Sequence, residues 1–417
     1  MMYARPARVV LALATLAVLA ACTRESEWSG SLADYLESRA DRLGPAIRDP
    51  EKHRVQVIYT QIDRDGQDVP SFTTYTYRVD ANEYFYPAST VKLPTALIAL
   101  EKLNRLAIAG LTRETTMLTG VANESQTPAV EDPTSPTGLP SIGNYIRRIL
   151  LVSDNDAFNR LYEFIGQEPL NAAMHAKGYT QTRILHRLES AMSVDENRRT
   201  NPVVFVDGDR MVFEQPAAVS RLDYTAEAPI LLGTAEIIDG ERFERPKDFA
   251  EKNAYPLMEQ HDVIRALLFP ASVPETRRFG LTEDDYRFVY RYMSMAPGDS
   301  GIAAYSDAEE YSEGYVRFLM FGGAGHVPDG IRVFNKVGDA YGFLTDAAYI
   351  VDLENGIEFI LAATVYANAN GTFNDNEYEY EAVGMPFLRE LGLIIHELEL
   401  ARPRAFRPDL RRLLFAE

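Results

Sequence analysis

Ser89 and Lys92 are a pair of residues whose types and spacing could perform chemistry. They lie in the stretch Tyr86-Pro-Ala-Ser-Thr-Val-Lys-Leu-Pro94, just before an apolar run at 96–103 that predicts a buried helix. Residues three apart share one face of a helix, so the hydroxyl and the amine would be neighbours. A serine becomes a nucleophile when an adjacent base takes its proton. A lysine held among apolar side chains can lose its charge and become that base.

This spacing alone has little specificity. With 18 Ser and 7 Lys in 417 residues, roughly 0.3 such pairs are expected by chance. A serine N-cap followed by a solvated lysine would explain the same letters. Two further motifs therefore matter: Ser153-Asp-Asn155 at a predicted corner between helices, and Lys336-Val-Gly338 at the end of a predicted strand. Each is common alone, as a turn or as a solvated strand end.

The elements that must position these motifs can be read from periodicity and turn signals. Strands are predicted at 54–62, 72–79, 203–206, 211–213, 332–336, 347–353 and 357–366, and helices at 31–43, after 89, at 142–152, after 155, at 257–268, at 282–292 and at 379–400. Strands thus lie at both ends of the chain and helices in its middle. This order predicts an α+β fold, in which the N- and C-terminal segments build one antiparallel sheet with flanking helices, beside an all-helical subdomain.

Taken in order, the three motifs resemble the serine β-lactamase and penicillin-binding-protein-like serine hydrolase superfamily. Within this superfamily, Asp154 in the second motif is similar to the aspartate of the class A enzymes. The resemblance extends over most of residues 50–400. It implies a catalytic domain at 46–417, with a sheet subdomain at 46–88 and 330–417 and a helical subdomain at 89–329. Residues 200–256 would be an insertion relative to a compact class A enzyme.

The resemblance implies how an acyl-enzyme would form. Ser89 would attack an amide or ester carbonyl and become acylated. Lys92 would be the nearest base for that step. Ser153 would relay a proton between Lys92 and the leaving nitrogen.

The resemblance also implies a substrate-binding set. Asn155 would hydrogen-bond a substrate amide, and Lys336 would supply positive charge for a substrate carboxylate. Gly338 would let a ligand approach the strand, and the backbone N–H of Asp339 would join that of the nucleophile in an oxyanion hole. Val337 replaces the usual Thr or Ser, so we expect a methyl group where a hydroxyl would bind the substrate carboxylate.

Deacylation needs a second base, which in class A enzymes is a Glu on an omega loop paired with an Arg. Glu189 lies 36 residues after Ser153, close to the family separation, and Arg187 would hold the loop. Glu196 is a competing candidate. Ser193 stands where the family has an asparagine that helps to hold the deacylating water.

The first 21 residues are typical of a secretory signal, with Arg5 and Arg8 before an apolar run at 9–21. Cys22, the only cysteine, follows Leu-Ala-Ala and resembles the lipidated cysteine of a bacterial lipoprotein. Residues 22–45 would then be a tether and a first helix. We expect an exported protein, lipid-anchored at the periplasmic face of the cell envelope, and Thr23 favours the outer membrane.

Composition limits the partners. The formal charge is −19, and loss of the two leader arginines would make it −21. Such an acidic protein repels nucleic acid and anionic lipid headgroups, so membrane contact would be through the lipid alone. No cofactor or metal is expected, because the six histidines are scattered without paired ligand spacing. We expect a monomer that acts on a β-lactam or a cell-wall-related amide.

Three functional hypotheses follow. The first is a class A-type β-lactamase that works through an acyl-serine. The second is a related hydrolase of another amide, peptide or ester, which Val337 and the 200–256 insertion favour. The third is a non-catalytic cell-envelope binding protein, and the intact set of serines, lysines and asparagine argues against it.

Overall fold

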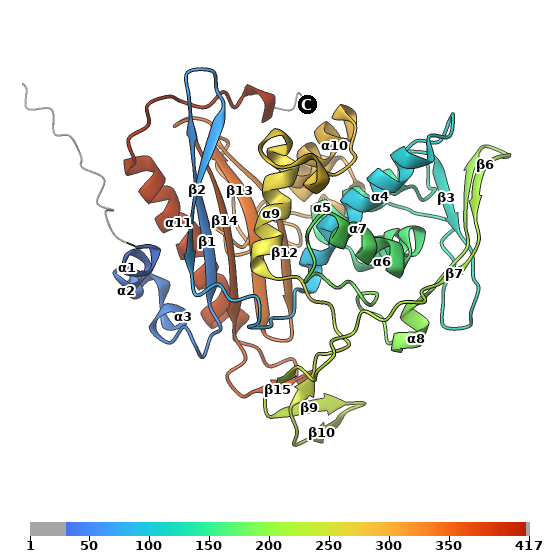
Figure 1. Cartoon of the computed structure of the whole chain (residues 1–417), viewed down its shortest axis with the longest axis horizontal. Coiled ribbons are helices and arrows are strands. Elements are labelled where there is room, and N and C mark those ends of the chain that lie inside the picture. Colours follow the sequence, from blue (N-terminus) through green and yellow to red (C-terminus); the bar gives the residue numbers. More distant parts are fainter. Residues whose placement is uncertain (1–30, 414–417) are drawn as a thin grey trace, which may run out of the picture.

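The centre of the molecule is a five-stranded antiparallel sheet with the strand order β12-β13-β14-β1-β2 (Figure 1). The computed structural model of the protein describes residues 31–413. The strands of the sheet are β1 (Gln56–Arg64), β2 (Pro70–Tyr77), β12 (Ile331–Ala340), β13 (Phe343–Asp352) and β14 (Ile357–Tyr366). β1 pairs with β14, so the two ends of the chain share one sheet. The predicted α+β fold with an antiparallel sheet is confirmed.

Both faces of the sheet are covered, which explains why every residue of β13 is buried. On one face lie α11 (Met385–Ala401) and three short helices, α1 (Leu32–Glu37), α2 (Ala40–Leu43) and α3 (Pro45–Arg48). On the other lie α9 (Leu257–Leu268) and α10 (Glu283–Ser294) (Figure 1). A strand covered on both sides needs a nearly continuous apolar sequence, as β13 and β14 have.

The helices beside this sheet begin and end at residues whose side chains cap them. Their bounds are α4 (Lys92–Leu106), α5 (Ile142–Val152), α6 (Asn155–Ile165) and α7 (Gln167–Ala176). Ser141 caps α5 by accepting from the Asn144 N–H, and Asp154 caps α6 by accepting from the Ala157 N–H. The corner between α5 and α6, where Ser153 lies, is therefore fixed from both sides.

The middle of the chain also contains short strands. They are β3 (Thr116–Thr119), β4 (Arg199–Thr200), β5 (Val203–Asp207), β6 (Arg210–Gln215), β7 (Ala218–Val219), β8 (Leu231–Leu232), β9 (Ala235–Ile238), β10 (Glu241–Phe243), β11 (Lys247–Asp248) and β15 (Thr372–Phe373), with α8 (Val194–Asn197) before them. β3, β5 and β6 form one small sheet, and β10, β9 and β15 form another, below the central sheet in Figure 1.

Two local predictions were wrong. The helix predicted at 31–43 is divided into α1 and α2, because the backbone of Arg39 leaves the helical conformation. No strand was predicted at β3, which pairs with β5, a segment too far along the chain for any local pattern to reveal the pairing. Between residues 31 and 413, no helix is long and apolar enough to cross a membrane.

Candidate active site

Ser89 and Lys92 lie side by side, as predicted. Ser89 belongs to a 3₁₀ turn, Ala88–Val91, and Lys92 is the first residue of α4. The Lys92 Nζ lies 2.8 Å from the Ser89 Oγ, and the lysine side chain is fully buried. The amine therefore contacts the hydroxyl directly, which is the geometry that proton transfer requires.

The surroundings of Lys92 favour its neutral form. Its Nζ lies 2.6 Å from Asn155 Oδ1 and 3.3 Å from Ser153 Oγ, and it also contacts the Ser153 carbonyl oxygen. Burial lowers the pKa of Lys92 well below its ordinary value, and the nearby charge of Lys336 lowers it further. A neutral amine has a lone pair to accept the proton of Ser89, so this lysine can act as a base near neutral pH.

The second motif is held by its own backbone. Ser153 has a left-handed φ of 59° just after α5, which turns its side chain and its carbonyl toward Lys92. Asp154 caps α6 and accepts from Arg148 at 2.9 Å. Its role in this structure is to fix the corner, while the serine and the asparagine on either side reach the site.

Lys336 extends the same hydrogen-bond network from β12. Its Nζ donates to Ser153 Oγ at 2.8 Å and to the Val337 carbonyl at 3.0 Å. Only 4% of Lys336 is exposed, and burial lowers its pKa to about 7. Ser153 Oγ thus lies between two lysine amines, which fits the predicted proton relay.

Gly338 is required by the close approach of β12 to the 3₁₀ turn. A Cβ at this position would lie 2.5 Å from the Pro87 carbonyl oxygen and 2.8 Å from the Ser89 nitrogen. Both neighbours are backbone atoms that cannot move aside cheaply. The glycine therefore keeps β12 against the nucleophile, with Asp339 next along the strand.

Our expectation for Val337 was wrong. The side chain is 3% exposed and belongs to the apolar core between the sheet and α11. Side chains alternate along a strand, so the neighbour of Lys336 points to the opposite face. Val337 therefore fills the core rather than leaving a methyl group at the substrate.

A pocket of about 550 Å³ opens above Ser89. Its walls come from five parts of the chain. The lining residues are Tyr86, Ala88, Ser89, Asn155, Leu188, Glu189, Asp339, Ala340, Tyr341, Asn374, Asn376, Tyr378 and Tyr380. The predicted residues Ser89, Asn155, Glu189 and Asp339 are thus brought together around one cavity, with Lys92 and Lys336 buried beneath it.

Glu189 lies in this pocket with its carboxylate directed at the second motif. Its Oε2 accepts from Asn155 Nδ2 at 2.8 Å. The competing candidate, Glu196, is already engaged at the start of α8. There it forms a capping box with Ser193, in which its Oε2 accepts from the Ser193 N–H and Oγ at 2.7 Å. The geometry therefore favours Glu189, and Ser193 serves as a helix cap.

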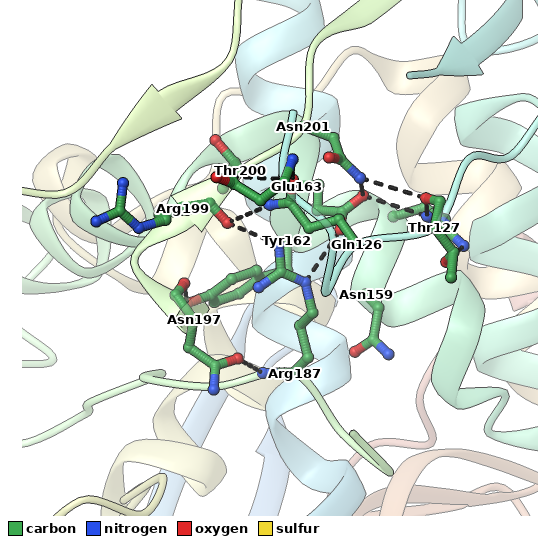
Figure 2. A network of polar contacts seen from close by, with 12 residues as sticks. Gln126, Thr127, Asn159, Tyr162, Glu163, Arg187, Asn197, Arg199, Thr200 and Asn201 are labelled. Atoms are coloured by element: carbon green, nitrogen blue, oxygen red, sulfur yellow. Dashed lines mark hydrogen bonds and ion pairs between the residues drawn. The ribbon is translucent and has the colours of Figure 1, made fainter. Parts of the chain in front are cut away.

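The loop that carries Glu189 is held by a buried network around Arg187 (Figure 2). The Arg187 Nε lies 3.0 Å from a carboxylate oxygen of Glu163, and both side chains are at most 3% exposed. Asn197 accepts from the Arg187 backbone N–H at 2.9 Å, and the Arg199 carbonyl accepts from its guanidinium at 2.8 Å. Arg187 is therefore positioned to hold the loop that carries Glu189, which is the role predicted for it.

The far wall of the pocket was missed by the sequence argument. Asn374, Asn376, Tyr378 and Tyr380 come from the segment between β14 and α11. An unusual alternation of Asn, Tyr and acidic residues at 374–381 was the available signal. It was not used, because these residue types are equally common in solvated turns.

The insertion supports this wall. Its strand β9 pairs in parallel with β15, and Asn374 Nδ2 donates to the Ile237 carbonyl at 3.0 Å. Phe249, fully buried, packs against Phe373 and Tyr341, with ring centroids 5.1 and 5.4 Å away. The insertion therefore shapes the pocket although it contributes no residue to the lining. In the described part of the chain, no cluster of three His, Cys, Asp or Glu could hold a metal ion.

Sequence comparison gives one family match. Residues 46–212 match the family described as "Beta-lactamase enzyme family". The matched segment includes Ser89, Lys92, Ser153, Asn155 and Glu189, and it ends before β12. The match supports a hydrolase of the serine β-lactamase superfamily. No curated protein matches the chain.

Among solved structures, similar chains include three β-lactamases. That of Sphaerobacter thermophilus is 12% identical with a TM-score of 0.48, over 88% of this chain and 99% of the other. Those of Desulfarculus baarsii and Streptomyces albus G are 16% and 14% identical, with TM-scores of 0.46 and 0.45. They cover 88% and 86% of this chain, and 99% and 98% of their own. Similarity at this level does not identify an activity.

Proposed function

We propose that the protein is a serine hydrolase of the β-lactamase type, which forms an acyl-enzyme at Ser89 and releases it with water. The observation that carries the proposal is the 2.8 Å contact between the Ser89 hydroxyl and a fully buried Lys92. A buried lysine whose pKa is lowered in this way can be neutral at physiological pH, and a neutral amine can take the proton of a serine.

The acylation step uses groups that are already in contact. Ser89 Oγ attacks the carbonyl carbon, and its proton passes to the neutral Lys92 amine. Ser153 Oγ, which lies 3.3 Å from the Lys92 Nζ and 2.8 Å from the Lys336 Nζ, passes a proton to the leaving nitrogen. The acyl–nitrogen bond breaks, and the acyl–oxygen bond to Ser89 remains.

The deacylation step falls to Glu189. Its carboxylate lines the same pocket as Ser89 and is oriented by Asn155. It would take a proton from a water molecule that attacks the ester, and the serine would leave with that proton. Asn155 would serve both steps, since its Oδ1 faces Lys92 and its Nδ2 faces Glu189.

A chromogenic cephalosporin tests the proposal. Purified protein is incubated with the compound while colour and intact mass are followed, with Ser89→Ala as the matched control. Sustained colour that is lost in Ser89→Ala supports a β-lactamase. A persistent adduct on Ser89 without turnover supports an acyl-serine enzyme with another substrate. Absence of any adduct with β-lactam and ester probes alike would refute the proposal.

A second candidate is hydrolysis of an amide or ester outside the β-lactam class. The observation that favours it is Asp339, an exposed acid among the residues that line the pocket, which would repel the carboxylate of a β-lactam bound there. The same Ser89 chemistry would then act on a cell-wall-related or peptide-like amide.

We further propose that the protein is exported and lipid-anchored at Cys22 on the periplasmic face of the cell envelope, where it acts as a monomer. Residues 1–30, which include the leader and Cys22, lie outside the described residues. Labelling with a radioactive fatty acid, lost in Cys22→Ser, tests the anchor. The oligomeric state is tested on mature protein that lacks the lipid, prepared without detergent. We expect its mass in solution to be that of a monomer.

A further inference from the structure

The charged side chains that line the pocket are all acidic. They are Glu189 and Asp339, and no lysine or arginine is among the lining residues. The segment 367–388, which builds the far wall, also has no basic residue, and it carries Asp375, Glu377 and Glu379. The entrance to Ser89 is therefore negative in character.

The two lysines below the pocket compensate only part of this charge. Burial raises the pKa of Asp339, and the charges of Lys336 and Lys92 oppose that rise; burial in turn lowers the pKa of each lysine, that of Lys336 to about 7. Lys247, which lies near Tyr341, is paired with Glu236 at 3.2 Å. The pocket lining thus contains two carboxyl groups and no cationic side chain, since both lysines are buried below it.

Of the two acids that line the pocket, Asp339 is the one that remains available to bind a ligand. It is exposed in the pocket, and no described residue donates a hydrogen bond to its side chain. Glu189, by contrast, is engaged by Asn155. A carboxyl group on a strand beside the nucleophile, with no hydrogen-bond donor among the described residues, is suited to bind a positive group of the substrate.

The aromatic wall adds to this preference. Four tyrosines line the pocket, and two of them are fixed by hydrogen bonds: Tyr378 accepts from the Asn374 N–H at 3.0 Å, and Tyr380 from the Gly342 N–H at 2.9 Å. Cations bind the faces of such rings. Tyr341 already shows this, because the Lys247 Nζ lies 5.6 Å from its ring centroid.

The position of Asp339 indicates which part of the substrate carries the charge. Asp339 lies near the end of β12 among the residues that line the pocket, and Lys336 on the same strand holds Ser153, the proposed donor to the leaving atom. Glu189 must face the acyl group, since it acts after the leaving group has departed. β12 therefore flanks the leaving group.

We propose that the natural substrate carries a cationic leaving group, such as an ammonium or guanidinium on the amine or alcohol side of the scissile bond, and that Asp339 binds it among the tyrosines. The proposal rests on the proposed acyl-enzyme at Ser89. It names the substrate class for that site: an amide or ester whose departing half is positively charged.

Three thioesters with one acyl group test this, because they differ only in the charge of the leaving thiol. Phenylacetyl thioesters of thiocholine, 3,3-dimethylbutanethiol and 3-mercaptopropionate have cationic, neutral and anionic leaving groups. In each, the acyl–sulfur bond breaks as the acyl–oxygen bond to Ser89 forms, and water then hydrolyses the ester. The released thiol is measured with a disulfide dye, and kcat/KM is compared for the purified full chain, Asp339→Asn and Glu377→Gln.

We expect kcat/KM to fall in the order cationic, neutral, anionic. In Asp339→Asn the ratio of cationic to neutral should drop about tenfold, as expected when one charge-assisted contact is lost. Glu377→Gln, an exposed acid of the same wall whose charge is screened by salt, should change the ratio less than twofold.

The outcomes separate this inference from the function on which it rests. Equal use of the three thioesters, preference for the anion, or an unchanged ratio in Asp339→Asn overturns the cationic substrate, while thiol release that needs Ser89 leaves the acyl-enzyme standing. If no thioester is cleaved and no adduct forms on Ser89, both proposals fail.

Discussion

Asn155 donates its Nδ2 to Glu189 Oε2 at 2.8 Å, while its Oδ1 lies 2.6 Å from the Lys92 Nζ. One amide therefore connects the base proposed for acylation with the base proposed for deacylation. Its two ends are not interchangeable, since one must accept from an amine and the other must donate to a carboxylate. The two steps can nevertheless be separated by substitutions on either side of the asparagine.

Glu189→Gln should leave acylation intact and trap the acyl-enzyme. The amide cannot take a proton from water, but it occupies the same volume beside Asn155. We expect the rate of adduct formation on Ser89 to change less than threefold and turnover to fall at least 100-fold, as measured by intact mass and product release. Glu196→Gln, which alters the helix cap of α8, is the control and should turn over normally. Normal turnover in Glu189→Gln would place the deacylating base elsewhere.

The pH dependence of acylation should report the charge of Lys336. The pKa of Lys92 is lowered by burial and, next, by the positive charge of Lys336. Acylation needs the neutral amine, so its rate rises as the pH rises through the pKa of Lys92. Lys336→Gln removes the positive charge, raises the pKa of Lys92 and moves the acid limb of the acylation rate to higher pH.

The control for this shift is Lys336→Arg, which keeps the charge and should leave the acid limb near its original position. The measurement is the rate of adduct formation on Ser89 between pH 4 and 9. The effect should be seen below about pH 7, because Lys336, with a pKa of about 7, is charged there. A limb that moves to lower pH in Lys336→Gln contradicts the assignment of Lys92 as the base.

Arg187→Met should destabilise the protein and impair deacylation. It removes the closer of the two arginines that pair with the buried Glu163 carboxylate and leaves Arg160 at 3.4 Å, which costs on the order of 1–3 kcal/mol. Chemical denaturation measures this loss. Arg210→Met is the control, because its pair with Asp207 is exposed by more than 60% on both sides and contributes less than about 1 kcal/mol. Equal stability of the two variants would show that the Arg187 network does not hold the loop.

Much of the catalytic centre could be predicted because its residues belong to short sequence motifs. Ser89 and Lys92 are one helical turn apart, and Ser153 and Asn155 flank one corner residue, so local geometry alone places them. The strand pattern also placed Lys336 at the end of a strand, from which it reaches the site. The same alternation rule shows that Val337 must face away from Lys336, and the prediction for Val337 failed because the rule was not applied to it.

The pocket wall could not be predicted in this way. Phe249 meets Tyr341 and Phe373 across about 90 and 120 residues of sequence, and β9 meets β15 across a similar distance. Such contacts depend on the packing of the whole insertion, which no periodicity records. The short strands of the insertion also have few residues each, so their alternation is too brief to predict a partner.

The insertion should therefore control substrate binding more than chemistry. Phe249→Leu keeps an apolar side chain but loses the ring that packs on Tyr341, Tyr86 and Phe373. The smaller side chain leaves a cavity at this buried site, which costs on the order of 1–3 kcal/mol, less than the stability of a typical domain, so the variant should fold. We expect KM for a turned-over thioester to rise at least fivefold while kcat stays within twofold, because Ser89, Lys92 and Glu189 are held by other elements. Phe243→Leu, on the half-exposed face of β10, should change neither. A fall in kcat with unchanged KM in Phe249→Leu would mean that the insertion positions the catalytic residues instead.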